Sequence, residues 1–81
     1  MRIQLLAFAS AGDAIGRETV ELEVPDGCTV ADLRRTLDER FSGLEPLWPR
    51  LAIAVDGDLK TADAPLHEGA EVALLPPVSG G

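Results

Sequence analysis

Hydrophobic and polar residues alternate along three separate stretches of this chain. The clearest is residues 19–24, where three aliphatic side chains share one face and polar side chains occupy the other. That period of two predicts a strand with one buried and one hydrated face. Residues 1–8 and 71–75 alternate less strictly and carry apolar side chains on both faces. We therefore expect them to be the first and last strands, lying side by side in the middle of a sheet.

Residues 29–41 follow a helical period instead. Thr29 is a candidate N-cap, and Asp32, three positions later, resembles the second member of a capping box. Ser42 and Gly43 are predicted to end the helix. Apolar residues recur along it at spacings of three and four and predict one core-forming stripe, made of Val30, Leu33, Leu37 and Phe41.

Shorter segments fill the rest of the chain. Two prolines within residues 46–49 are expected to keep the helix from resuming. Residues 51–55 are nearly all apolar and predict a central strand, which the Asp-Gly pair at residues 56–57 ends in a turn. Residues 64–66 can supply only a brief edge segment, because their proline has no N–H to donate. Residues 9–17 predict a loop that can include one helical turn.

The predicted order is strand, strand, helix, strand, short strand, strand. One helix on one face of a mixed sheet is an α+β, two-layer architecture. This order is that of the β-grasp, or ubiquitin-like, fold, with four to five strands and one main helix. We expect residues 1–75 to form this domain and residues 76–81 to form an extended, flexible tail.

Composition narrows the choice of partners and compartment. Fourteen acidic residues against seven basic ones give a net charge of −7. Such a surface repels nucleic acid, whose phosphates need Lys and Arg, and favours a basic partner; alternatively, the charge only keeps a small domain in solution. No apolar run approaches the roughly 18 residues of a membrane span, and the start of the chain reads as a strand and not as a signal peptide. Because one cysteine allows no internal disulfide, we expect a cytoplasmic protein.

The candidate chemistry lies in the last six residues, Pro76, Pro77, Val78, Ser79, Gly80 and Gly81. The two prolines end the sheet ladder and bias the backbone toward an extended form. At roughly 3.3 Å per residue, such a segment reaches about 20 Å from the domain. The two glycines make its end thin enough to enter a narrow channel of another protein. A loose, inert terminus is the alternative.

The Gly81 carboxylate needs help from other proteins to react. With a pKa near 3.5, a free α-carboxylate is ionised and unreactive at neutral pH, so it must be activated, most simply as an acyl-adenylate. The chain has no phosphate-binding glycine loop, and one His and one Cys cannot make a zinc site. We therefore expect no metal or cofactor on this chain and an activating partner that binds ATP.

Residues 71–81 read Glu-Val-Ala-Leu-Leu-Pro-Pro-Val-Ser-Gly-Gly and follow Pro-Leu-His-Glu-Gly at residues 65–69. This ending resembles that of the small, sulfur-carrier subunit of molybdopterin synthase. The Phe-Ala pair at residues 8–9 and the segment 29–33 that opens the helix are similar to that family too. The family often carries Arg-Glu in the first loop, where residues 12–13 of this chain are Gly-Asp.

The resemblance implies a mechanism for the tail. An adenylating partner would activate Gly81, behind Gly80, and a sulfur-donating protein would convert the carboxylate to a thiocarboxylate. The tail would then enter the active site of the large synthase subunit and give its sulfur to cyclic pyranopterin monophosphate. The family's assembly is a heterotetramer, a dimer of large subunits with one carrier at each end. On this reading the chain is a co-substrate and not an enzyme on its own.

Candidate partner-binding residues are those that are apolar or lie where the tail leaves the sheet, namely Phe8, Leu75, Pro76, Pro77, Val78 and Ser79. For the apolar ones, ordinary core is the alternative.

Trp48 is interpreted as a cover for the open end of the core, with a partner anchor as the alternative. Cys28 is interpreted as the residue before the N-cap that packs against Leu33, with a reactive thiol as the alternative. His67 lies in a turn with no nearby nucleophile, and a solvated turn residue and a functional one are equal alternatives for it.

Other functions compete with molybdopterin synthesis. A carrier could deliver sulfur for thiamine, cysteine, a thiolated tRNA base or a secondary metabolite. A ubiquitin-like modifier would join Gly81 to lysines of target proteins. A plain interaction module would keep its function without the two terminal glycines.

Overall fold

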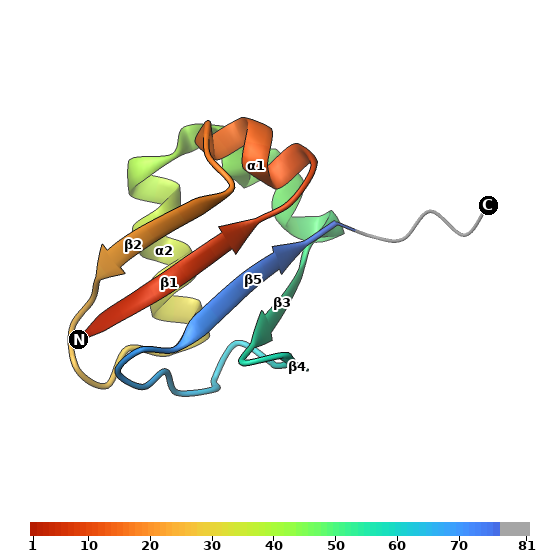
Figure 1. The fold of residues 1–81 in the computed structure, drawn as a ribbon. Coiled ribbons are helices and arrows are strands. Elements are labelled where there is room, and N and C mark those ends of the chain that lie inside the picture. Colours follow the sequence, from red (N-terminus) through yellow and green to blue (C-terminus); the bar gives the residue numbers. More distant parts are fainter. Residues whose placement is uncertain (77–81) are drawn as a thin grey trace.

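The computed structural model describes residues 1–76, which form five strands, two α-helices and one 3₁₀ helix (Figure 1). In chain order these are β1 (Arg2–Ala7), α1 (Ser10–Ile15), β2 (Thr19–Glu23), α2 (Val30–Arg40), η1 (Ser42–Arg50), β3 (Ala52–Val55), β4 (Asp58–Leu59) and β5 (Glu71–Leu75). The expected α+β, β-grasp order is confirmed.

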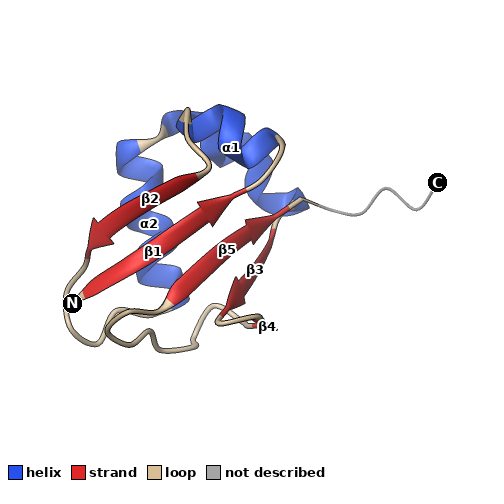
Figure 2. Ribbon diagram, in the orientation of Figure 1, coloured by secondary structure: helices blue, strands red, loops and turns tan. Residues whose placement is uncertain are grey.

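The sheet has the strand order β2-β1-β5-β3-β4 (Figure 2). β1 and β5 are parallel and central, and the outer pairs are antiparallel. In this register Leu5 lies between Val20 of β2 and Val72 of β5. The prediction that the first and last strands lie side by side is therefore confirmed.

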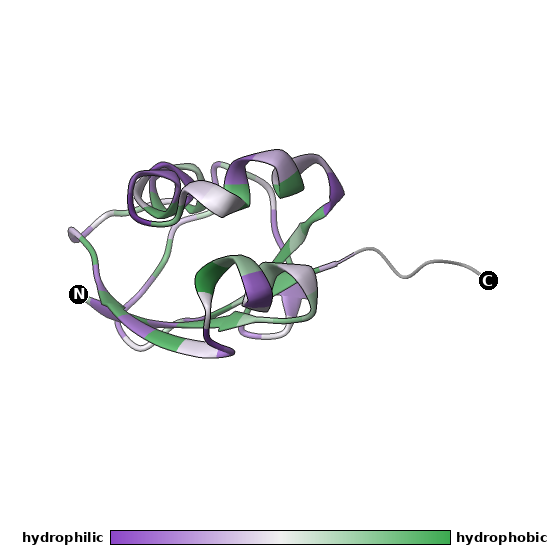
Figure 3. Ribbon diagram, turned by 90° about the horizontal axis from the view of Figure 1, so that it is seen from above, coloured by the Kyte–Doolittle hydropathy of each residue, from purple (hydrophilic) through white to green (hydrophobic). Residues whose placement is uncertain are grey.

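One face of the sheet packs against α2, which lies on one side of the strands in Figure 3. Between the two layers lies the core, whose largest fully buried side chains are Ile3, Leu5, Leu22, Leu33, Leu37, Leu44, Val72 and Leu74. Six of these residues come from the odd positions of β1, the even positions of β5 and the predicted stripe of α2, and the other two are Leu22 of β2 and Leu44 of η1. No described element crosses the other face of β1 and β5, which is turned toward the viewer in Figure 1.

The start of α2 is a complete capping box, as predicted. The Asp32 N–H donates to Thr29 Oγ1 at 3.2 Å, and the Thr29 N–H donates to Asp32 Oδ2 at 3.1 Å. Two N–H groups at the helix start thus gain partners without help from distant parts of the chain. These reciprocal bonds fix where α2 begins, and so where its apolar stripe meets the sheet.

The segment after α2 differs from the prediction. The two prolines do not keep the chain from coiling again, because Pro46 and Pro49 both lie inside η1. A 3₁₀ helix of short turns leaves many N–H groups without helical partners, so a missing proline N–H costs little there. Leu44 and Trp48 of η1 are buried and close one end of the core.

The edge strand also differs from the prediction. Residues 64–66 contribute only an isolated bridge between Pro65 and Thr29. The two-residue strand β4 lies instead after the Asp-Gly turn, where Asp56 has φ 52° and Gly57 has φ 89°. Two successive left-handed residues match the twist of a tight hairpin. β3 is therefore not central: it is next to last in the sheet and is covered on its outer side by β4 alone.

The first loop contains a six-residue helix, α1, where a loop with at most one helical turn was predicted. A Cβ at Gly12 would lie 2.9 Å from the Ala7 carbonyl oxygen, so only glycine fits this close approach of α1 to β1. No helix among residues 1–76 has the length and apolar content needed to cross a membrane.

An open apolar sheet face beside the chain exit

The uncovered face of the sheet is apolar around the end of β5. Because side chains alternate along a strand, residues between the buried ones of β1 and β5 point away from α2. Leu6 of β1 lies opposite Ala73 of β5, and Ala73 lies opposite Ala54 of β3. Leu75, the last residue of β5, lies opposite Ala52. Three neighbouring strands thus place small and aliphatic side chains on one surface.

Two large side chains enlarge this surface. Phe8, just after β1, is 45% exposed, and Leu59 of β4 is 71% exposed. We call the whole set the sheet patch: Leu6, Phe8, Ala52, Leu59, Ala73 and Leu75. A contiguous apolar surface on a small domain commonly marks a site of protein interaction.

The sheet patch adjoins the point where the chain leaves the domain. The Phe8 N–H donates to the Leu74 carbonyl at 3.4 Å, which holds Phe8 beside the end of β5. Pro76 follows Leu75 and is half-buried. Three of the predicted partner-binding residues are thus brought together, and none of them is fully buried core. The predictions for Pro77, Val78, Ser79, Gly80 and Gly81 lie outside the described residues.

Acidic residues border the sheet patch on the β2 side. Glu21 and Glu23 lie on the same face and are exposed. Arg2 pairs with Glu23 at 3.2 Å, and Gln4 lies opposite Glu21. One end of the face is therefore polar, and the end near Pro76 is apolar. A partner that covers both ends of this face would meet carboxylates beside an apolar centre. Basic side chains at the rim of the partner's surface would complement them.

The cysteine is structural. Cys28 is 3% exposed and lies in the same core cluster as Leu33. Burial raises the pKa of the Cys28 thiol, and the nearby Asp32 carboxylate raises it further. A raised pKa leaves little thiolate at neutral pH, so the helix start does not activate this sulfur.

Trp48 is also a core residue. Its side chain is 5% exposed, and its Nε1–H donates to Asp38 of α2. The Arg34 guanidinium stacks on the ring, 4.8 Å from its centroid. The interpretation as a cover for the end of the core is confirmed, and a free partner anchor is excluded because the ring is already enclosed.

His67 is exposed, as the interpretation as a solvated residue expects, but it is also paired with Asp56. Its Nε2 contacts Asp56 Oδ2, and Asp56 Oδ1 accepts the Glu71 N–H at 3.0 Å. The hydrogen bond to Asp56 raises the pKa of His67, while the bonds from Glu71 and His67 lower the pKa of Asp56. The pair ties the β3–β4 turn to the start of β5. Within residues 1–76, no three His, Cys, Asp or Glu side chains gather as a metal site would need.

Fold and surface together define a small ubiquitin-like β-grasp domain whose last strand ends beside an apolar face. A search of family models agrees. The model described as "ThiS family" matches residues 5–81, so the chain belongs to that family.

Curated relatives extend over the whole chain. It is 36% identical over 83 residues to the molybdopterin synthase sulfur carrier subunit of Escherichia coli, covering 98% of this chain and 99% of the relative. The subunit of the same name from Arabidopsis thaliana is 30% identical over 81 residues, covering 100% and 84%. Small archaeal modifier protein 3 of Haloferax volcanii is 27% identical over 92 residues, covering 100% of both chains. The resemblance inferred from the residues is confirmed.

Solved structures share the fold. SAMP1 from Haloferax volcanii superposes with a TM-score of 0.87 at 27% identity and covers 100% of both chains. A chain from the complex of subunits 1 and 2 of the Helicobacter pylori molybdopterin-converting factor superposes with a TM-score of 0.74 at 30% identity, again over 100% of both chains.

Proposed function

We propose that this chain is the sulfur carrier subunit of a molybdopterin synthase and that its reactive group is the Gly81 carboxylate. The observation that carries the proposal is the sheet patch beside Pro76, in a domain that matches curated carrier subunits along its whole length. A carrier needs a surface that docks a partner and a chain end that the docked partner can reach. Phe8 and Leu75 supply such a surface where β5 ends.

The proposed chemistry proceeds in two steps at Gly81. The carboxylate oxygen attacks the α-phosphorus of ATP on the activating partner, which releases pyrophosphate and leaves an acyl-adenylate. A persulfide of the donor protein then attacks the carbonyl carbon and expels AMP, which leaves an acyl disulfide between Gly81 and the donor. A second thiol attacks the donor sulfur of that S–S bond, forms a disulfide with the donor and releases the thiocarboxylate. Its sulfur is a better nucleophile than the carboxylate oxygen, so it can add to cyclic pyranopterin monophosphate in the large subunit.

The docked assembly follows from the same surface. The similar Helicobacter pylori chain belongs to a complex of subunits 1 and 2 of molybdopterin-converting factor. We infer that the sheet patch of this chain docks on a large subunit, with the acidic residues of β2 at the rim. The chain would then be consumed and recharged as a co-substrate, with the catalytic side chains on the large subunit.

Intact-mass measurement tests the proposal directly. The full chain is incubated with the adenylating enzyme and sulfur donor of the same organism, ATP and a sulfur source. We expect a mass increase equal to one oxygen replaced by one sulfur, located at Gly81 by fragmentation. The matched control lacks Gly80 and Gly81 and should stay unmodified while remaining folded. An unmodified full chain, under conditions in which a known carrier is thiolated, would contradict the proposal.

Protein modification is the second candidate, favoured by the match to small archaeal modifier protein 3 over the full length of both chains. It predicts that Gly81 is found in an isopeptide bond to lysines of other proteins. Mass spectrometry of cell extract distinguishes the two functions, because a pure sulfur carrier leaves no such conjugates. A carrier for another sulfur pathway would be thiolated equally but would not restore molybdopterin synthesis in a strain that lacks this chain.

A further inference from the structure

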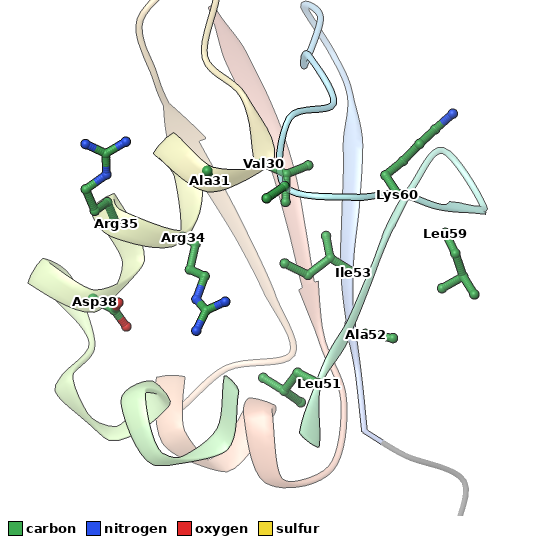
Figure 4. A pocket seen from close by; sticks show the side chains of 11 residues that line it. Val30, Ala31, Arg34, Arg35, Asp38, Leu51, Ala52, Ile53, Leu59 and Lys60 are labelled. Carbon is green, nitrogen blue, oxygen red and sulfur yellow. The ribbon is translucent and has the colours of Figure 1, made fainter. Parts of the chain in front are cut away.

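A groove of about 550 Å³ separates α2 from β3 on the helix side of the sheet (Figure 4). Its apolar floor is made by Val30 of α2 and by Leu51 and Ile53, whose side chains point into the space between the helix and the strand. Leu51 and Ile53 are half-buried, so apolar surface remains accessible to a ligand. Ala52 and Leu59, which belong to the sheet patch, also border the groove.

Both ends of the groove are held in place by internal contacts. At one end, the N–H groups of Val30 and Ala31 donate to the carbonyls of Ala64 and Ala62 at 2.9 and 2.8 Å. At the other end, Trp48 contacts Asp38 and Arg34 of α2 and so holds the helix side of the groove in place. The shape is therefore preformed, which lowers the entropy cost of binding a ligand there.

The charge of the groove is opposite to that of the whole chain. Three of the seven Lys and Arg side chains line it, but only one of the fourteen acidic ones, Asp38. Asp38 already accepts the Trp48 N–H, and Arg35 pairs with Asp32 at 2.7 Å. Arg34 and Lys60 form no ion pair with another described residue. Two cations are thus available at the rim of an apolar groove, a combination that complements carboxylates beside aliphatic side chains.

Residues 58–60 cover the outer edge of β3 beside the groove. β4 pairs with Ala54 and Val55, and the Lys60 N–H donates to the Ile53 carbonyl at 3.0 Å. Lys60 therefore lies directly beside Ile53, at the rim of the apolar floor. An extended segment bound in the groove could contact Lys60 while its alternate side chains reach the floor.

We propose that this groove is a second docking site, which binds an extended segment of a partner protein carrying aliphatic residues next to Asp or Glu. The groove lies on the opposite layer from the sheet patch, so a protein bound through Phe8 and Leu75 leaves it accessible. The site goes beyond the proposed sulfur-carrier function, because it uses neither the tail nor Phe8 and Leu75, and it shares with the sheet patch only Ala52 and Leu59 at its border. It would let the chain hold a second protein while its end is being modified or used.

Peptide selection followed by NMR tests the proposal. A random heptapeptide library displayed on phage is selected against the full chain, and recovered peptides are titrated into the ¹⁵N-labelled protein. We expect peptides rich in Asp or Glu together with Val, Ile or Leu, and shifts at the amides of Val30, Ile53 and Lys60. The double variant R34E/K60E should weaken binding by roughly tenfold or more. Lys60→Glu alone keeps the Arg34–Trp48 stack and should weaken binding to a smaller extent.

Matched controls separate the groove from general charge effects and from the proposed function. R17E/R40E makes the same change in net charge away from the groove and should bind the peptides as the unaltered chain does. Deleting Gly80 and Gly81 should leave peptide binding intact even though it abolishes thiolation. Recovery of neutral or basic peptides, shifts confined to Leu6, Phe8 and Leu75, or no peptide that shifts the groove amides would each overturn the proposal.

Discussion

Replacing Phe8 by alanine separates docking from folding, because about half of this side chain is still exposed in the free chain. Complete burial of a Phe side chain is worth about 1.5–3 kcal/mol. With Phe8 45% exposed, roughly half of that, about 1 kcal/mol, remains to be gained when a partner covers it. Phe8→Ala should therefore weaken docking about fivefold, while folding loses a similar amount of about 1 kcal/mol.

Calorimetric titration of the large synthase subunit of the same organism into the carrier measures the first effect, and urea unfolding measures the second. Gln4→Ala is the matched control, because Gln4 lies on the same strand and face at its polar end. We expect the control to bind as the unaltered chain does. Leu75→Ala should resemble Phe8→Ala, since Leu75 is half-buried beside the same exit.

Two results would refute this reasoning. If Phe8→Ala binds the large subunit as tightly as the unaltered chain, the sheet patch is not the docking surface. If Phe8→Ala unfolds as readily as Leu5→Ala, where a fully buried side chain is truncated, the loss of binding reflects loss of the fold and says nothing about docking.

The remaining predictions concern stability. Leu74 is fully buried, so Leu74→Ala should lower the free energy of unfolding by about 2–5 kcal/mol, and a urea midpoint like that of the unaltered chain would contradict the packing described. Thr29→Ala removes one half of the capping box with Asp32 and should cost about 1 kcal/mol, visible as a lower melting temperature. The stability that protonated His67 contributes is complete below its ordinary pKa of 6.5 and is lost as the pH rises through its raised pKa. The stability that ionised Asp56 contributes is present above its ordinary pKa of 3.8 and is lost as the pH falls through its lowered pKa. The difference in stability between the unaltered chain and His67→Gln should therefore be widest between about pH 4 and 6.5 and smaller on both sides, whereas a difference that does not change with pH would show that the pair does not contribute.

Local sequence determined the elements whose stabilising contacts are themselves local. The capping box of Thr29 and Asp32 uses two residues three positions apart, and the alternation of β2 needs only its own side chains. The Gly-Gly ending at residues 80–81 can also be recognised without knowing where anything else lies, and the chemistry proposed for it stays a prediction. The central, side-by-side position of β1 and β5 followed from the apolar residues on both faces of both strands, whereas their parallel direction was shown only by the structure.

Tertiary structure decided what depends on distant residues. α1 was not predicted as a helix because it is short, lacks a side-chain cap and rests on the close approach of Gly12 to Ala7. β4 formed after the Asp-Gly turn and not at Pro65, because a hairpin brings its two strands together directly.

The two surfaces proposed for binding also depend partly on local sequence and partly on tertiary structure. Alternation predicts that a strand has two faces, but only the packing of α2 on one side shows that the other is bare around Phe8. The groove joins Val30 and Arg34 of the helix to Ile53 and Lys60 of the sheet edge, segments that are far apart in the sequence. Its charge and apolar floor arise only when folding sets these segments side by side, because no contiguous segment of the chain contains all of them.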